Sequence, residues 1–78
     1  MKLIRKISIG SDNKNDAMHY SVGQQVYGGH EISAILFEGE DASYNIYIKK
    51  NSEVLPWKKF NSNNLFNNTS FTSITIIL

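Results

Sequence analysis

The sequence predicts an all-β fold, a β-meander or small barrel of about five to six antiparallel strands, in one domain that covers residues 1–78. Between Tyr20 and Phe60, short runs of alternating apolar and polar residues are separated by turn-forming residues about every ten positions. The separating segments are Gly28-Gly29, the acidic patch 38–41 and Asn51-Ser52. Small β folds of this kind commonly act by presenting a surface, so the pattern indicates architecture more directly than activity.

The chain combines 78 residues, 41% hydrophobic content and no cysteine. A domain of this size buries only roughly 60% of the surface that its unfolded form exposes, and it commonly gains stability from disulfides, metals or partner subunits. The lack of cysteine excludes disulfides, and His19 and His30 are too few for a four-ligand structural zinc site. We therefore expect no metal, no cofactor and association into a homo-oligomer.

The N-terminal segment predicts one strand over residues 2–9, followed by a polar turn at 11–16. The strand would place Leu3, Arg5, Ile7 and Ile9 on one face and Ile4, Lys6 and Ser8 on the other. In the turn, Asp12 is suited to cap a short helical turn that runs to Met18, with a plain loop as the alternative. A calcium loop is disfavoured because Lys14 stands where such a loop needs an oxygen ligand.

The central segment predicts a hairpin that turns at Gly28-Gly29, since glycine supplies the positive φ that a tight hairpin needs. Its first arm would carry Val22 and Val26, and His30 would open its second arm. The apolar face of the second arm is expected to comprise Ile32, Ala34 and Leu36. The next strand, from Tyr44 to Lys50, is expected to point Tyr44, Ile46 and Ile48 inward and Asn45, Tyr47 and Lys49 outward.

Two further strands are expected on either side of a polar linker at 61–70. The first contains Pro56, which argues for an edge position or a bulge because proline cannot donate to a strand ladder. The last strand occupies 71–78, with Ile74, Ile76 and Leu78 on one face and Thr75 and Ile77 on the other. Because both faces become apolar near its end, we expect this strand to close the sheet or to pair with another subunit.

The most suggestive functional residues are aromatic and basic side chains that neighbouring strands would bring onto one surface. They are Tyr47, Lys49, Trp57, Lys58 and Lys59. Flat rings suit the stacking of a base and ammonium groups suit a phosphate, so this surface is a candidate site for a nucleotide-like ligand or a protein partner. The alternative is structural, with Trp57 packed over the end of a barrel and the lysines solvated on an outer face.

Nothing in the sequence indicates an enzyme. His19 and His30 are the natural acid or base candidates, but neither has a recognisable partner. No serine lies in a nucleophile elbow or a Ser-x-x-Lys motif, and the carboxylates of the acidic patch lie in a turn, where a solvated loop explains them. No glycine-rich phosphate loop occurs. We predict a protein without catalytic residues.

The net charge and the amino-acid bias of the chain limit its partners, location and origin only broadly. The net charge of +1 and the dispersed basic residues lack the footprint of a dedicated DNA-binding domain. Residues 1–10 are basic but contain neither the apolar run nor the cleavage site of a secretory signal, so a cytoplasmic location without membrane association is expected. Abundant Asn, Ile, Lys and Ser, with Arg5 as the only arginine, indicate AT-rich coding, as in many bacteriophages and some bacteria.

Two resemblances add to this interpretation. The patterns Tyr-x-Val-Gly-Gln-x-Val from Tyr20, His-x-Ile-x-x-Ile from His30 and Tyr-x-Ile-Tyr from Tyr44 resemble the strands of small Src-homology-3-like (SH3-like) barrels. The Ile-Ser-Ile-Gly opening and Trp-Lys-Lys-Phe at 57–60 are similar to small accessory proteins of T-even-type bacteriophages. This second resemblance implies an anti-defence product that acts in the host cytoplasm by binding a host protein or sequestering a nucleotide signal.

Three hypotheses for the function follow. The first is a self-associating, non-enzymatic inhibitor of phage type that uses the aromatic and basic surface to bind a host protein or a nucleotide. The second is a nucleic-acid-binding barrel, in which the same rings stack bases and the lysines meet phosphates. The third is a structural or assembly module whose terminal strand extends the sheet of a partner.

Overall fold

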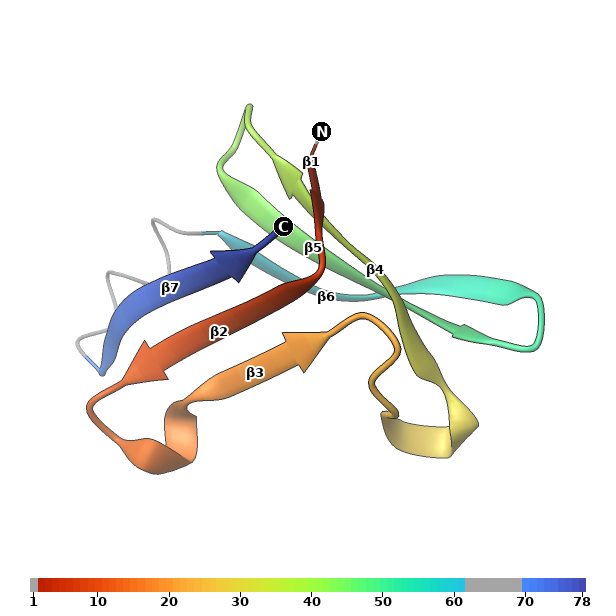
Figure 1. Cartoon of the computed structure of the whole chain (residues 1–78), viewed down its shortest axis with the longest axis horizontal. Coiled ribbons are helices and arrows are strands. Elements are labelled where there is room, and N and C mark those ends of the chain that lie inside the picture. Colours follow the sequence, from red (N-terminus) through yellow and green to blue (C-terminus); the bar gives the residue numbers. More distant parts are fainter. Residues whose placement is uncertain (1, 62–69) are drawn as a thin grey trace.

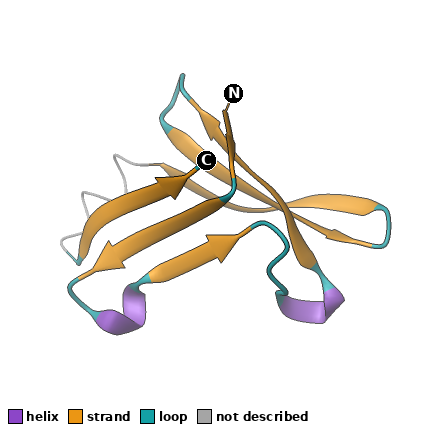
Figure 2. Ribbon diagram, viewed as in Figure 1, coloured by secondary structure: helices purple, strands orange, loops and turns teal. Residues whose placement is uncertain are grey.

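The chain folds into seven strands and two short 3-10 helices (Figure 1), seen in a computed structural model that describes residues 2–61 and 70–78. The elements are β1 (Lys2–Ile4), β2 (Lys6–Ser11), η1 (Lys14–Asp16), β3 (Met18–Ser21), η2 (Tyr27–Gly29), β4 (Glu31–Glu38), β5 (Ser43–Lys50), β6 (Glu53–Asn61) and β7 (Phe71–Ile77). Figure 2 shows both helices as single turns between strands. The all-β prediction is confirmed, with more strands than the five to six expected.

The strands form two antiparallel sheets. The first has four strands in the order β1-β4-β5-β6, and the second has three in the order β3-β2-β7. The sheets do not close into a barrel, so the meander is the arrangement found among the described residues. The C-terminal strand β7 pairs with β2 of the same chain. The linker expected at 61–70 falls largely on residues 62–69, which lie outside the described part of the chain.

The predicted first strand is divided at Arg5, where the chain passes from one sheet to the other. The Arg5 N–H donates to the carbonyl of Ile77 at 2.8 Å, and the Arg5 carbonyl accepts from the N–H of Val22 at 3.0 Å. The expected alternation of faces was therefore wrong before Arg5: Ile4 is 3% exposed and Leu3 is 72% exposed. The break reverses which side of the chain faces the core, so Ile4 joins Ile7 and Ile9 inside.

Isoleucine fills the space between the sheets. The buried apolar residues are Ile4, Ile7, Ile9, Ile32, Ile35, Tyr44, Ile46 and Ile48. The inward face predicted for β5 is confirmed, whereas that of β4 was wrong after Ile32, because the pairing of β4 with β5 shifts between Ile32 and Ala34. This bulge turns Ile35 into the core and leaves Ala34 and Leu36 half-buried.

The hairpin predicted at Gly28-Gly29 was wrong as a pair of strands, because β3 and β4 lie in different sheets and the segment between them makes an isolated bridge, Gln25 to Glu31. The strand before it is β3, which ends at Ser21, so Val22 lies exposed outside a strand. Gly28 and Gly29 adopt positive φ values of 63° and 78°, as expected, and the N–H of Val26 donates to the carbonyl of His30 at 2.9 Å. In the earlier polar turn, the cap of η1 is Asn13 rather than Asp12, since the Asn13 side chain accepts from the N–H of Asn15.

Strand β6 carries Pro56 on the edge of the four-stranded sheet, as predicted. The register with β5 shifts there, because Ile46 lies opposite Lys58 while Tyr47 lies opposite Pro56. Trp57 is therefore an extra residue, and the segment is a bulge on an edge strand. This bulge shapes the surface on which the candidate functional residues lie.

Candidate functional site

The bulge in β6 forms one wall of a small pocket between β5 and β6, here called the bulge pocket. Its volume is about 210 Å³. It is lined by Asn45, Ile46, Tyr47, Pro56, Trp57, Lys58 and Lys59. Four of the residues predicted from the sequence, Tyr47, Trp57, Lys58 and Lys59, therefore line one pocket, and Lys49 does not. The Lys49 ammonium lies 4.0 Å from the Glu31 carboxylate, across the pairing of β5 with β4.

Trp57 belongs both to the pocket wall and to the packing between the sheets. Its ring meets Tyr20 edge-on, with centroids 5.6 Å apart, and lies 6.4 Å from the ring of Tyr27. The ammonium of Lys58 sits 4.8 Å from the centroid of the Trp57 ring, within the range of a cation–π contact. Trp57 therefore packs against the core, as in the structural alternative, and also lines the pocket, because the bulge leaves its half-buried ring between the two.

Tyr47 provides the second aromatic ring of the pocket. It is half-buried, and no aromatic pair involves it among the residues that the structure describes. Asn45 lies two residues earlier on the same face of β5, and its amide nitrogen donates to the Ser43 hydroxyl at 3.2 Å. A ring and an amide are therefore presented side by side along one strand.

Lys59 connects the pocket with a wider polar hollow of about 470 Å³. That hollow shares Asn45, Tyr47 and Lys59 with the pocket and adds Glu38, Glu40, Asp41 and Ser43. The Lys59 ammonium lies 3.2 Å from the Asp41 carboxylate, and both side chains are largely solvated, so the pair contributes little to stability. The cationic group of Lys59 and the acidic groups of residues 38–41 thus lie together in the polar hollow, which adjoins the bulge pocket along β5.

The Asp41 carboxylate is held in its charged form. The Ser43 hydroxyl donates to it at 2.6 Å, and this hydrogen bond together with the contact to Lys59 lowers the pKa of Asp41 below its ordinary value. Lys59 is therefore partly neutralised in the free protein. Lys58 has no carboxylate within ion-pair distance in the described part of the chain, which leaves its ammonium as the available positive charge of the pocket.

The two histidines lie apart from this pocket. Nδ1 of His19 is 3.1 Å from the Ser8 hydroxyl, a pair formed across β2 and β3 on an exposed face. Nδ1 of His30 is 3.1 Å from the carbonyl of Tyr27, and the two rings stack. Within residues 2–61 and 70–78, no three metal-ligating side chains form a group that could hold an ion.

Pairing across strands explains which residues the sequence analysis missed. Asn45 and Pro56 line the pocket because Asn45 lies opposite Lys59 and Pro56 opposite Tyr47. The outward alternation of β5 already placed Asn45 on the same face as Tyr47, so that residue was within reach of the sequence pattern. The sequence pattern did not reveal the extra residue at the bulge, which brings Pro56 opposite Tyr47.

No protein-family model, curated protein or solved structure matches the chain. Over the described residues, no helix is both long enough and apolar enough to cross a membrane. The proposed function therefore rests on the geometry of the bulge pocket.

Proposed function

We propose that the protein is a non-enzymatic binding protein that holds a nucleotide-like ligand in the bulge pocket. The observation that carries this proposal is that Tyr47, Lys58 and Lys59 line one pocket together with Asn45. Aromatic faces stack bases with little dependence on sequence, and each stacked base contributes about 1–3 kcal/mol. Ammonium groups at the same place provide the charge that a phosphate requires.

The base and the phosphate of a nucleotide each have a matching group in the bulge pocket. A base would stack on Tyr47, with the Asn45 carbonyl oxygen free to accept from its exocyclic amine, since the Asn45 nitrogen already donates to Ser43. The phosphate would lie at Lys58, which has no carboxylate beside it among the described residues.

The pocket volume limits what is held firmly. At about 210 Å³ the bulge pocket is smaller than the sites of about 300–1,000 Å³ that enclose drug-sized ligands. Only one base would be enclosed, while the sugar and phosphate would lie at the edge of the pocket. With the resemblance to phage accessory proteins, such binding would serve to withhold a nucleotide signal from a host defence system.

The experiment is a titration monitored by Trp57, which is the single tryptophan of the chain and lines the pocket. The probes are the four ribonucleoside monophosphates and cyclic di-AMP, with inorganic phosphate and oligo-dT for comparison. We expect saturable quenching by at least one nucleotide and at least about tenfold weaker binding by Tyr47→Ala and Lys58→Ala. Lys14→Ala is the matched control, since Lys14 is exposed on η1 and does not line the pocket.

The result that would overturn the proposal is equally direct. If no nucleotide binds at millimolar concentration, or if Lys14→Ala weakens binding as much as Lys58→Ala, the pocket is not a nucleotide site. If oligo-dT binds far more tightly than any mononucleotide, with a steep loss of affinity in salt, the hypothesis of a nucleic-acid-binding protein replaces it.

A further inference from the structure

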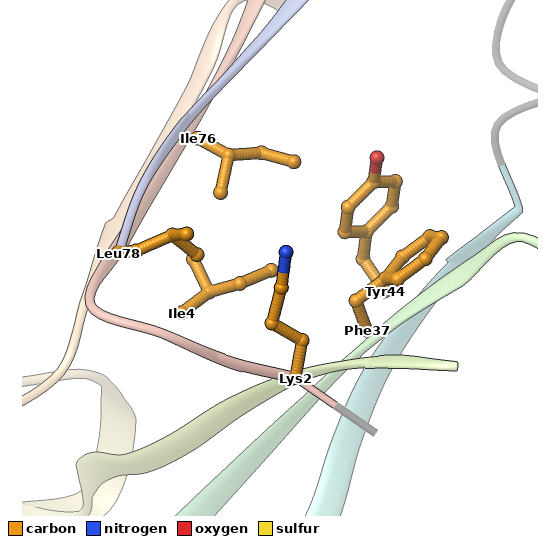
Figure 3. Close-up of a pocket in the computed structure, with 6 residues that line it drawn as sticks. All are labelled: Lys2, Ile4, Phe37, Tyr44, Ile76 and Leu78. Carbon is orange, nitrogen blue, oxygen red and sulfur yellow. The ribbon is translucent and has the colours of Figure 1, made fainter. Parts of the chain in front are cut away.

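A second pocket opens between the two sheets where they fail to close, and it shares no lining residue with the bulge pocket. Its volume is about 230 Å³. It is lined by Lys2, Ile4, Phe37, Tyr44, Ile76 and Leu78, which are drawn in Figure 3. We call it the mouth pocket. Residues near both ends of the described chain contribute to its lining, and Figure 1 shows the two ends lying near each other.

The topology explains why this space is open. After Arg5 the chain leaves the four-stranded sheet, and β7 pairs with β2 rather than with β1. The end of β7 therefore passes over the inner face of β4 and β5 without joining their hydrogen-bonded ladder. The rings of Phe37 and Tyr44, with centroids 5.0 Å apart, form an aromatic floor on that inner face. The opposite wall is aliphatic and comes from Ile76 and Leu78.

Two hydrogen-bond donors converge on this apolar space. Tyr44 is only 8% exposed, and its hydroxyl makes no hydrogen bond to any residue that the structure describes. Figure 3 shows the Tyr44 and Lys2 side chains extending into the space bounded by Ile76 and Leu78. No carboxylate in the described part of the chain lies within ion-pair distance of the Lys2 ammonium. The Tyr44 hydroxyl, which solvent can reach, and the Lys2 ammonium thus both lie at the pocket without a partner among the described residues.

We propose that the mouth pocket binds a small amphiphilic acid, with an apolar body between the aromatic floor and the aliphatic wall and a carboxylate at Lys2 and Tyr44. The Lys2 ammonium can only donate hydrogen bonds, and the Tyr44 hydroxyl can donate one as well, so an acceptor at the polar end of the ligand satisfies both. The ammonium adds a preference for negative charge, because hydrogen bonds between ionised groups are the stronger ones. The remaining lining is apolar and excludes a second polar group.

The volume sets the size of this ligand. A water molecule occupies about 30 Å³ of liquid, so 230 Å³ corresponds to a body of about eight non-hydrogen atoms. Medium-chain fatty acids and phenylalkanoic acids have this size and charge. A nucleotide does not fit this description, so the proposal goes beyond the binding function assigned to the bulge pocket and is tested separately.

The test uses the full chain and octanoate as the probe, with octanol and octylamine as isosteric neutral and cationic controls. Binding is followed by amide chemical shifts in two-dimensional NMR. We expect octanoate to shift the amides of the lining residues and to bind at least about tenfold more tightly than octanol, since one charge-assisted contact is lost in the alcohol. Equal binding of octanol and octanoate would overturn the proposal.

Two variants separate the polar contacts from general packing. Tyr44→Phe removes only the hydroxyl, and Lys2→Met removes the charge from an exposed side chain without touching the core. Each should weaken octanoate binding about tenfold while leaving octanol binding unchanged. Lys6→Met is the matched control, because Lys6 is an exposed lysine on β2 that does not line the pocket. Octanoate binding that survives both variants would overturn the proposal.

A second copy of the chain is the competing occupant. If an apolar side chain of another copy fills the pocket, the apparent affinity for octanoate will fall as protein concentration rises, and octanoate will lower the native mass. That result would overturn the assignment to a small acid. Loss of nucleotide binding at the bulge pocket would have no bearing on this outcome, since the two pockets share no lining residue.

Discussion

Strands β5 and β7 have similar sequence patterns but are buried to different extents. Both alternate polar residues with isoleucine, in SYNIYIKK and FTSITII. In β5, flanked by β4 and β6, Tyr44, Ile46 and Ile48 are buried. In β7, which has β2 as its neighbour among the described strands, Ile76 and Ile77 are each 38% exposed.

The difference teaches that alternation specifies a strand, whereas position in the sheet specifies how much of it is buried. A central strand is covered on both edges and on its inner face, and an edge strand is covered on one side only. The apolar surface that β7 does not bury contributes Ile76 to the wall of the mouth pocket. The incomplete burial of this strand and the candidate ligand site are therefore two aspects of one structural feature.

The largest expected effect tests this contrast directly. Ile46→Ala should lower the free energy of unfolding by about 2–5 kcal/mol, because it removes a fully enclosed side chain from the core. Ile76→Ala should cost roughly 1 kcal/mol, since its side chain already borders open space. Chemical denaturation of both variants measures the difference. Equal losses would mean that β7 is as tightly covered as β5.

The second prediction concerns the join between β7 and β2. A side chain at Gly10 would place its Cβ 2.5 Å from the Ser73 hydroxyl, which lies opposite Gly10 in the strand pairing. Gly10→Ala should therefore destabilise the fold by about 1–3 kcal/mol, as overpacking does. The double variant Gly10→Ala with Ser73→Ala should recover at least half of that loss. No loss in the single variant would show that the serine simply rotates away.

The same contrast explains how far the sequence could predict the fold. The strand pattern of β5 was predicted correctly because a central strand obeys simple alternation. Prediction failed where one residue shifts the alternation, at Arg5 and at the bulge between Ile32 and Ala34, since neither break carries a glycine or a proline to announce it. Such shifts arise from how the two sheets pack, which a local pattern does not contain.

A local sequence pattern is limited in the same way for the candidate sites. Aromatic and basic residues of β5 and β6 were expected on one surface, and pairing of these strands brings Tyr47, Trp57, Lys58 and Lys59 to one pocket. The mouth pocket was not foreseen, because its residues come from four strands that are distant in the sequence. Only the topology, with β7 returning beside β1, assembles them. A largely buried tyrosine whose hydroxyl has no partner among the described residues is a tertiary feature and leaves no sequence signal.

The third prediction concerns Tyr20, which joins the two sheets away from the mouth pocket. Its ring packs on Trp57 and Phe60 of β6, and this burial raises the pKa of Tyr20 above 10.0. The folded state then holds the proton longer than the unfolded state, so stability is complete below pH 10.0 and falls as pH rises through the folded pKa.

Tyr20→Phe should remove part of this alkaline loss. Urea denaturation at neutral pH and at about pH 11 measures the change in each protein, and the variant should show the smaller decline. Tyr27→Phe serves as the control, because Tyr27 lies beside Trp57 but is mostly exposed. An identical alkaline decline in wild type and in Tyr20→Phe would show that this packing does not penalise the tyrosinate.

The smallest expected effect lies at the turn that precedes β5. Asp41 accepts from Ser43, the first residue of β5, and its pKa is lowered below 3.8 by that hydrogen bond and by Lys59. A lowered pKa contributes stability above pH 3.8 that disappears as pH falls through the folded pKa. Asp41→Asn should therefore be slightly less stable than wild type at neutral pH and indistinguishable from it near pH 2.

Thermal melts of the two proteins across this acid range test the prediction, with Asp16→Asn on η1 as an exposed acidic control. A difference that persists unchanged at the lowest pH would assign the effect to the shape of the side chain rather than to its charge. A difference that vanishes would show that the start of the buried strand β5 is fixed by a charged hydrogen bond, in addition to the isoleucines that follow it.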